Sequence, residues 1–395
     1  MSLPALRLRR RHERRVRRGH PWVYSNEVDI ERSPLTGFSP GECVNVIGHS
    51  GRPLGSAYVN PQVLICARLF SAEADRVLDG DLIAQRLGEA LALRDALGWS
   101  PWCRLVHGEG DRLPGLVVDR YADVLAVQIG TAGMERARAA IVAALVEGLR
   151  PSAIVLRNDI PSRALEGLEQ GVEVVHGELP ERLVLEENGA RFEISPLEGQ
   201  KTGWYYDQRG NRALAAALAA DRSVLDCFSY TGGFGIQAAR AGARSVLCVD
   251  SSESALEQAA RNAELNGIAD RLERRRGDAF DTLRALREDG RVFDLVIVDP
   301  PAFIRRRKDA QAGLEAYRRL NRRAIQVLAE GGLLVSASCS SHLGGDEHQA
   351  LVAGAANDVG RWVQVLARGH QAADHPVHPA LAESEYLKAL LVRVL

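Results

Sequence analysis

Hydrophobic and polar residues alternate along the second half of the chain in two rhythms. Short runs rich in Val, Leu and Ile, such as SVLDCF (223–228), SVLCVD (245–250) and FDLVIVDP (293–300), have the pattern of buried strands. Between and after them, the spacing predicts helices at 234–241, 252–265, 280–288, 312–329 and 345–356, and further strands within 272–279, 331–340, 362–369 and 387–395. Such alternation is typical of an α/β domain with a parallel sheet and helices on both faces.

The first half of the chain is organised differently. Short β-like segments broken by Gly and Pro are predicted at 21–28, 42–48, 53–60 and 63–70. Helical spacing follows over 79–97 and 134–149, with a strand-like AIVLR at 153–157. We therefore predict a β-rich domain at 1–73, a central α+β domain at 74–189 and an α/β domain at 190–395.

The composition is that of an ordinary globular protein. With 395 residues, 46% of them hydrophobic and 26% charged, the chain excludes disordered, collagen-like and fibrous classes. No uncharged apolar stretch approaches the roughly 20 residues that span a bilayer. The first twenty residues are basic and are not followed by the apolar core of a secretory signal. We therefore expect a cytoplasmic protein without a membrane partner.

Cysteine and histidine spacing gives no sign of a metal site. The six cysteines lack a CxxC pair, which argues against a zinc site or a disulfide framework and predicts mostly buried, reduced thiols. His107, His342 and His348 also lack ligand spacing, so we expect them at the surface or behind the site. The predicted set of metal ligands is empty.

The formal net charge of −1 hides an uneven distribution. Residues 1–73 carry a net +5, with eight Arg between Arg7 and Arg18, and residues 300–325 carry +6, which leaves −12 for the remainder. Local clusters of Arg and Lys bind phosphate backbones whatever the total charge is. We expect RNA contacts at Arg14, Arg15, Arg305 and Arg306; the alternative for each segment is a solvated helix face.

Carboxylates follow four strands of the predicted α/β domain. Asp226, Asp250, Asp278 and Asp299 stand at the ends of successive strands, where such sheets bind ligands. The Gly-rich turn after the first strand reads TGGFG instead of GxGxxG, which disfavours a dinucleotide. A single Asp after a strand is more often a helix cap than a ligand. Four in succession indicate a binding site.

These motifs carry a family resemblance. VLDCFSYTGGFG, VLCVDSS, GDAF and DLVIVDPPAF resemble the Rossmann-like class I S-adenosylmethionine-dependent methyltransferases, and the whole chain resembles the RlmI-type 23S rRNA cytosine-C5 methyltransferase family. GHPWVYSNEV (19–28) is similar to the start of that family's PUA RNA-binding domain. EGDRLPGLVVDRY (109–121) is similar to its central domain, and GQKTGWYYDQRGNR (199–212) to the segment before its catalytic sheet.

The resemblance implies roles for individual residues. It places Asp226, Ser229, Gly232 and Gly233 on the methionine side of S-adenosylmethionine, Asp250 at the ribose and Asp278 at the adenine edge. It also implies that Lys201 to Arg209 form a lid or wall of the same pocket. The implied partner is rRNA, naked or in an assembling large subunit, and a homodimer is left open.

The resemblance further implies a catalytic thiol, Cys339, in the sequence Ser338-Cys339-Ser340. Carbon C5 of cytosine is a poor nucleophile, and a thiolate that adds to C6 raises the electron density at C5 and later leaves. Asp299 is implied to hold the N3/N4 edge of the base. The simpler interpretation of Cys339 is a small buried hydrophobic residue, which we also assign to Cys227 and Cys248.

Three other functions stay open at this stage. Asp-Pro-Pro-aromatic motifs also occur in enzymes that methylate amino or ring nitrogens without a thiol, so DPPAF permits N-methylation of guanine or adenine in RNA. The chain is also compatible with a non-catalytic RNA-binding or ribosome-assembly factor. A small-molecule methyltransferase is disfavoured because it has little use for an Arg-rich β domain.

Overall fold

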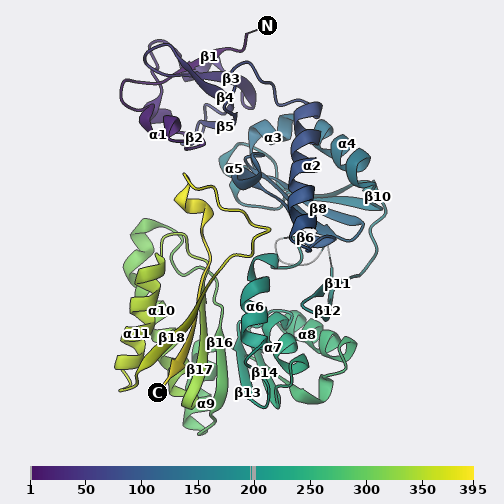
Figure 1. Ribbon diagram of the computed structural model, residues 1–395, viewed down its shortest axis with the longest axis vertical. Coiled ribbons are helices and arrows are strands. Elements are labelled where there is room, and N and C mark those ends of the chain that lie inside the picture. The colour runs from purple at the N-terminus through teal and green to yellow at the C-terminus, as the bar shows by residue number, and fades with distance from the viewer. Residues whose placement is uncertain (1, 196, 198–201) are drawn as a thin grey trace. The chain divides into compact units, whose positions relative to one another are not determined.

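The computed structural model describes residues 2–195, 197 and 202–395. Its contacts form two compact units (Figure 1). The first unit comprises Met1–Leu183, Ile194–Tyr206 and Ala373–Ser384, and the second comprises Val184–Glu193, Asp207–Ala372 and Glu385–Leu395. None of the helices within the described residues is long and apolar enough to cross a membrane.

The N-terminal part of the first unit is a small β-sheet with strand order β1-β3-β4-β5-β2. The strands are β1 (Ala5–Arg7), β2 (Trp22–Val23), β3 (Glu42–Ile47), β4 (Pro53–Val59) and β5 (Ala67–Ser71). The short helix α1 (Arg14–Arg17) adds Val16 to a core that includes Leu6, Val44 and Val59. The sheet itself confirms the β-rich pattern predicted for this region.

Two of the strands predicted here are too long. The segment 21–28 forms strand β2 and then a 3₁₀ turn, because the Glu27 carboxylate accepts a hydrogen bond from the Tyr24 backbone N–H and folds the chain back. The segment 63–70 becomes a strand at Ala67, because the Asn60 side chain first closes a turn by accepting from the Gln62 N–H.

The central part of the first unit is a second sheet, with order β10-β9-β8-β7-β6. Its strands are β6 (Trp102–His107), β7 (Leu116–Tyr121), β8 (Val124–Ile129), β9 (Ala153–Arg157) and β10 (Val172–Gly177), and its helices are α2 (Gly80–Ala96), α3 (Ala132–Arg136), α4 (Arg138–Leu149) and α5 (Ser162–Leu165). Strands β8 and β9 are parallel and the other pairs are antiparallel. Where the sequence predicts one helix at 134–149, the structure has two helices, α3 and α4, which meet at Ala137.

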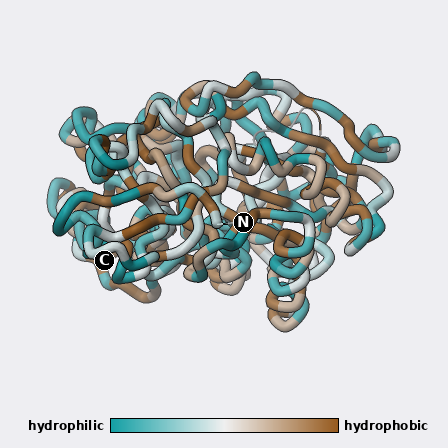
Figure 2. Tube along the Cα trace, turned by 90° about the horizontal axis from the view of Figure 1, so that it is seen from above, coloured by the Kyte–Doolittle hydropathy of each residue, from teal (hydrophilic) through white to brown (hydrophobic). Residues whose placement is uncertain are grey.

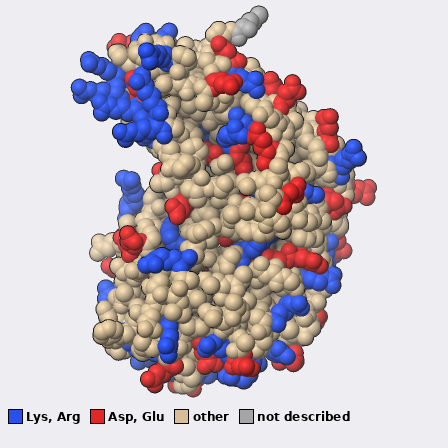
Figure 3. Space-filling model, viewed as in Figure 1, with Lys and Arg blue, Asp and Glu red and all other residues tan. Residues whose placement is uncertain are grey.

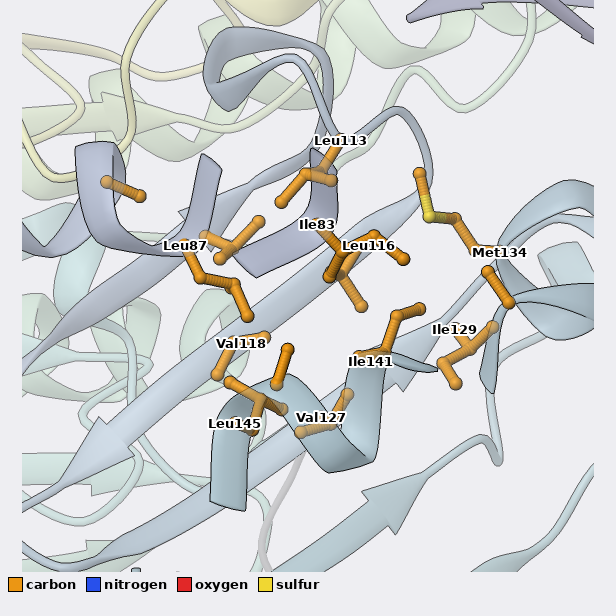
Figure 4. Close-up of a cluster of buried hydrophobic side chains, with 14 of the residues drawn as sticks. Ile83, Leu87, Leu113, Leu116, Val118, Val127, Ile129, Met134, Ile141 and Leu145 are labelled. Atoms are coloured by element: carbon orange, nitrogen blue, oxygen red, sulfur yellow. The ribbon is translucent and has the colours of Figure 1, made fainter. Parts of the chain in front are cut away.

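Helices α2 and α4 press their apolar sides onto this sheet. Figure 4 shows Ile83 and Leu87 of α2 and Ile141 and Leu145 of α4 pointing at side chains of β7 and β8, with Met134 of α3 at the end of the cluster. All five of these side chains are almost fully buried. Asp79 starts α2 by accepting a hydrogen bond from the Leu82 N–H.

The EGDRLPGLVVDRY segment (109–121) has a structural role in this core. Asp111 forms a bidentate pair with Arg94, with Nη1–Oδ1 and Nη2–Oδ2 distances of 2.6 and 2.8 Å, and also accepts from the His107 backbone N–H at 2.6 Å. Arg94 is fully buried, and its remaining donors reach the carbonyls of Arg104 and Asp374. The carboxylate thus neutralises a guanidinium that has no access to water.

The second unit begins with a two-stranded sheet of β11 (Leu183–Glu187) and β12 (Ala190–Ile194). The residues between the strands, Asn188 and Gly189, both have positive φ angles, 52° and 76°. Asn-Gly is the dipeptide that type I′ hairpin turns favour. The sequence analysis predicted no strands here and missed the hairpin.

The main sheet of the second unit has the order β15-β14-β13-β16-β17-β19-β18. Its strands are β13 (Ser223–Cys227), β14 (Ser245–Asp250), β15 (Leu272–Arg276), β16 (Phe293–Val298), β17 (Leu328–Ser338), β18 (Val363–His370) and β19 (Lys388–Val394). Its helices are α6 (Arg209–Ala216), α7 (Gly233–Arg240), α8 (Glu253–Leu265), α9 (Ala279–Glu288), α10 (Ala310–Gln326) and α11 (Gly345–Asn357). The predicted Rossmann-like α/β fold is confirmed.

One feature of this sheet corrects the sequence prediction. Strand β19 is antiparallel to both of its neighbours, so the sheet is mixed and not purely parallel. The chain leaves β18 at the carboxyl edge and has no helix to carry it back before β19 begins, so the last strand must run in the opposite direction. Lys388, the first residue of β19, therefore lies at the carboxyl edge.

Helices cover both faces of the main sheet. Leu283 of α9, Leu320 of α10 and Val352 of α11 pack in one cluster with Leu225 and Val296 of the sheet. On the other face α7 lies so close to β14 that a Cβ on Gly235 would stand 2.8 Å from the Cys248 sulfur. Figure 2 shows how hydrophobic and hydrophilic stretches alternate along the chain.

The buried pair of Arg94 and Asp111 gives a test of this fold. Asp111→Ala leaves the Arg94 guanidinium buried without a counter-charge, and we expect the free energy of unfolding to fall by about 3–5 kcal/mol. Urea denaturation measures the change. Asp281→Ala, which breaks an exposed pair with Arg284, is the control and should cost about 1 kcal/mol or less. Equal effects of the two substitutions would contradict the structural role of Asp111.

Candidate active site

The carboxyl ends of β13 to β17 meet at one edge of the main sheet. These strands pair in parallel, β14 with β15 and β13, and β16 with β13 and β17. Parallel pairing brings each strand's last residues to the same edge. The sequence-predicted site residues at the ends of these strands are therefore gathered in one region: Asp226, Asp250, Asp278, Asp299 and Cys339.

The loop after β13 has an unusual backbone. Phe228, Tyr230 and Gly232 have positive φ angles of 62°, 48° and 86°. Positive φ is uncommon for a residue with a side chain, and such conformations cluster at ligand sites. At Gly232 a Cβ would approach the Ile236 side chain to 2.8 Å, so glycine is required there on both grounds. The predicted residues Ser229 and Gly233 are buried in the same loop and at the start of α7.

Asp250 holds this loop in place. Its Oδ2 accepts a hydrogen bond from the Tyr230 N–H at 2.9 Å, and its Oδ1 accepts from the Ser252 N–H at 2.9 Å. Each carboxylate oxygen has two lone pairs, so both atoms retain capacity for a further donor such as a ribose hydroxyl. Asp250 is thus able to support the loop and to bind a ligand together.

Asp278 lies at the same edge as an exposed helix cap. Its Oδ1 accepts hydrogen bonds from the N–H groups of Phe280 and Asp281 and starts α9. These are the contacts of a helix N-cap, which is the more common role of a single Asp after a strand. The role at the adenine edge stays a prediction.

Asp226 is a buried acid at this edge. Burial, together with the nearby charges of Asp299 and Asp250, raises its pKa to about 7 against the lowering effect of the Gly235 N–H and of Arg212. Oδ2 accepts from the Gly235 N–H at 2.9 Å, whereas Oδ1 is buried and has no hydrogen-bond partner among the described residues. A buried acceptor without a donor is uncommon in native proteins and indicates a missing ligand group.

Cys339 lies against the backbone of the DPPAF segment. The Cys339 Sγ is 4.0 Å from the carbonyl oxygen of Pro300, the residue directly after Asp299. Both Cys339 and Asp299 are half-buried, whereas Cys227 and Cys248 are fully buried within their strands, as predicted for packing residues. Burial raises the pKa of both of these inner thiols well above the ordinary range.

A buried tyrosine joins the DPPAF segment and the Cys339 turn. The Tyr317 hydroxyl of α10 accepts from the Phe303 N–H at 3.3 Å and from the Ser338 hydroxyl at 2.8 Å, and it lies 2.9 Å from the Ser340 hydroxyl. The DPPAF segment and the Cys339 turn are therefore both fixed to Tyr317. The sequence analysis missed this residue because its position in α10 has no motif of its own.

Lys388 and His348 lie behind the Cys339 turn. Lys388 Nζ donates to the carbonyl oxygen of Ser340 at 2.7 Å. His348, which we expected at the surface or behind the site, is fully buried and lies 3.1 Å from the Ser336 hydroxyl. Burial, reinforced by the charge of Lys388, lowers the pKa of His348 to about 4. His348 is therefore neutral at physiological pH.

The segment 199–212 contains residues of both units. Lys201 lies outside the described residues, so the predicted lid or wall of 201–209 stays a prediction. Thr202 and Trp204 bind the Tyr121 side chain of β7 in the first unit. In the second unit Arg212 donates to the buried Glu187 carboxylate at 2.7 Å.

The N-terminal basic segment divides into exposed and engaged arginines. Figure 3 shows Lys and Arg side chains gathered on one part of the surface. Arg14 is exposed, but Arg15 donates to both Glu27 oxygens at 3.0 and 2.9 Å and lies over the Tyr24 ring. Arg15 therefore stabilises the folded GHPWVYSNEV segment, and its charge is already paired.

The second basic segment divides in the same way. Arg305 is exposed, whereas Arg306 pairs with Asp309 at 2.9 Å. Further along, Arg318 pairs with Asp358, and Arg319 lies over the Phe280 ring. Exposed positive charge of this segment therefore lies both in the loop before α10 and on α10, where Arg322 is exposed.

The comparisons with known proteins agree with this geometry. A model described as an S-adenosylmethionine-dependent methyltransferase matches residues 166–393, and one described as a PUA-like domain matches residues 6–72. Two solved structures share the fold at low identity. A protein from Streptococcus mutans described as an S-adenosylmethionine-dependent methyltransferase has a TM-score of 0.83 at 21% identity, covering 99% of this chain and 100% of that chain. SMU.776, described as a methyltransferase and solved with SAH, has a TM-score of 0.85 at 22% identity and the same coverage.

Two curated relatives match almost the full length. Ribosomal RNA large subunit methyltransferase I of Shewanella denitrificans is 40% identical over 397 residues, 98% of this chain and 99% of the relative. The protein of the same name from Aliivibrio fischeri is 39% identical over 389 residues, 97% of each. The chain belongs to the ribosomal RNA large subunit methyltransferase I family, and its catalytic part to the S-adenosylmethionine-dependent methyltransferases.

Proposed function

We propose that the protein forms 5-methylcytosine in 23S rRNA by adding the Cys339 thiolate to C6 of the target base. The observation that carries this proposal is the contact between Cys339 Sγ and the carbonyl of Pro300, beside Asp299. A nucleophile and a carboxylate suited to the N3/N4 edge of cytosine then face the same base. N-methylation through DPPAF has no use for the thiol at this position.

The proposed reaction proceeds in three steps on the base. The Cys339 sulfur forms a bond to C6, and the C5=C6 electron pair shifts toward C5 and the N3/N4 edge of the base. Asp299 stabilises that edge. Carbon C5 takes the methyl group, which S-adenosylmethionine supplies in electrophilic form when it is bound. Loss of the C5 proton to a base then restores the double bond and releases the Cys339 thiolate.

The residues at the edge of β13 and β14 fit the cofactor. The ammonium of its methionine part matches the unpartnered Oδ1 of Asp226, and a cation there relieves the crowding of that carboxylate with Asp250 and Asp299. We place Ser229, Gly232 and Gly233 along the same part and the ribose at Asp250. Asp278 is left for the adenine edge.

We further propose that the exposed arginines contact the rRNA backbone. A target base in folded RNA has to leave its stack to reach Cys339, and backbone contacts hold the strand while it does so. Arg14 and Arg305 are better candidates than Arg15 and Arg306, whose charges are paired within the protein. The cytoplasmic location and the homodimer stay predictions.

Covalent trapping tests the proposed nucleophile. In 5-fluorocytosine a fluorine replaces the C5 proton and cannot leave as a cation, so the thiolate stays bound to C6. We therefore expect RNA with this base at the target to form a denaturant-resistant complex with the wild type and none with Cys339→Ala. Denaturing gel electrophoresis after incubation with S-adenosylmethionine detects it, and Cys43→Ala, which changes another half-buried thiol, is the matched control. Methylation by a wild type that never crosslinks would overturn the thiol mechanism and favour N-methylation.

Asp226→Asn tests the cofactor site through two opposite effects. Loss of the charge-assisted contact should weaken S-adenosylmethionine binding about tenfold or more in calorimetry. Without cofactor, the variant should be more stable than the wild type at pH 8. At that pH the wild type must bury an ionised Asp226 carboxylate, whose pKa near 7 shows that burial disfavours the charge, whereas the Asn side chain is neutral.

The pH dependence of this stability has a definite sign. The folded wild type retains a proton on Asp226 that the unfolded chain releases above pH 4, so its stability falls as the pH rises from about 4 to 7. The advantage of Asp226→Asn in melting temperature should therefore shrink as the pH is lowered from 8 toward 4. Unchanged cofactor affinity, or a pH-independent difference in stability, would contradict the assignment.

Salt dependence tests the RNA contacts. Arg14→Gln and Arg305→Gln should each weaken binding to RNA of any sequence and reduce the slope of log K against log salt by about 0.7–0.9. Fluorescence anisotropy at several salt concentrations measures both quantities. Arg244→Gln, at the opposite, amino-terminal end of β14, is the control with no expected change in slope. Slopes that match the control would show that these arginines are solvated surface groups.

A further inference from the structure

Lys388 supports the turn that carries Cys339 from the neighbouring strand. It is the first residue of β19 and lies opposite Ser338 in the antiparallel ladder with β17. Its Nζ donates to the carbonyl oxygens of Ser340, at 2.7 Å, and of Tyr386, at 2.9 Å. The ammonium is thereby held between the carbonyl of the residue that follows Cys339 and a carbonyl of its own segment.

The amino acid at this position is unusual for this chain. Among its 50 basic residues Lys occurs at 201, 308 and 388 and all the others are Arg. A half-buried position next to a thiol therefore carries the rarer cation, although arginine is the common choice throughout the sequence. An ammonium is a compact point charge with three donors, which suits a narrow place between two carbonyls better than a planar guanidinium does.

Charged and titratable groups surround this place on every packed element. Asp299 follows β16, Tyr317 comes from α10, His348 from α11 and Glu385 precedes β19. His348 is neutral because its pKa is about 4, and burial raises the pKa of the Tyr317 phenol, which is therefore neutral as well. Burial lowers the pKa of Lys388, and the opposite charges of Cys339 and Glu385 partly offset this. Of these described groups, Lys388 is the cation, and its ammonium is fixed to the carbonyl of the residue after Cys339.

We propose that Lys388 is a positioning residue that stabilises the thiolate form of Cys339 and fixes the Ser338–Ser340 turn. The Cys339 S–H bond breaks, the proton goes to solvent, and the sulfur retains the electron pair beside the Lys388 ammonium. An opposite charge within a few ångströms favours the ionised thiol. The use of the Cys339 thiolate in methylation rests on the proposed function. The formation of the thiolate does not.

Alkylation of the full-length protein tests the proposal without RNA or cofactor. The rate of iodoacetamide labelling at Cys339, followed by mass spectrometry of that peptide between pH 5 and 10, reports the thiolate fraction. In Lys388→Met we expect the midpoint of this profile to rise by about one pH unit or more, so labelling at pH 7 slows about tenfold. Lys388→Arg should restore part of the rate.

The matched control lies on the same strand. Arg393→Met removes a positive charge from β19 at the end away from Cys339, opposite Leu333, and should leave the profile unchanged. A profile for Lys388→Met that superimposes on that of the wild type overturns the proposal. So does an equal shift in Arg393→Met, because the effect is then general charge and not position.

A reciprocal measurement covers the case in which Lys388→Met does not fold. Since coupling between two sites is mutual, Cys339→Ala should lower the pKa of Lys388 and speed its labelling by acetic anhydride at neutral pH. Unchanged Lys388 labelling would overturn the proposal. A positive result here with no 5-fluorocytosine crosslink in the wild type would retain the thiolate and reject the proposed reaction, so the two failures are distinguishable.

Discussion

The parallel hydrogen bonding of β13 to β17 is the constraint on which the rest of this site depends. It forces five strand ends, and the polar residues that follow them, to one edge of a buried sheet. Asp226 and Cys339 are far apart in the sequence but lie in the same region. The strand pairing alone brings them there, without any contact between their side chains. The helices on the two faces exclude water from the sheet and leave this edge as the place for ligands.

The same gathering creates an electrostatic problem. Asp226, Asp250 and Asp299 are close enough that the second and third raise the pKa of the first, which burial has already raised. Asp250 is compensated by two backbone N–H groups, that of Tyr230 in the strained loop after β13 and that of Ser252 before α8, and Asp226 by the N–H of Gly235. A cationic ligand removes the remaining imbalance. The site therefore destabilises the free protein, and binding of a positive group removes this destabilisation.

Much of this arrangement follows from sequence patterns, and the exceptions have physical reasons. Alternation located the strands and helices of the second unit, and the end of each strand located the acids and Cys339. The direction of β19 was not predictable from its own hydrophobic run, since it depends on the absence of a crossover helix after β18. Lys388 and Tyr317 were missed because their roles arise from contacts across strands and helices. The hairpin of β11 and β12 had a signal, Asn188-Gly189, that was not used.

Charge counts along a sequence mix two kinds of arginine that the fold separates. Arg15 and Arg94 are held by carboxylates and aromatic rings in the segments that most resemble the family's first two domains, so the matched residues there specify the fold. Arg14 and Arg305 project into solvent from the same basic stretches. A net charge of +5 or +6 already subtracts a pair within the segment, such as Arg15 with Glu27, but not a pair with a carboxylate elsewhere, such as Arg318 with Asp358. The number of arginines that remain available to phosphates, and not the total number of arginines, sets the salt dependence of RNA binding.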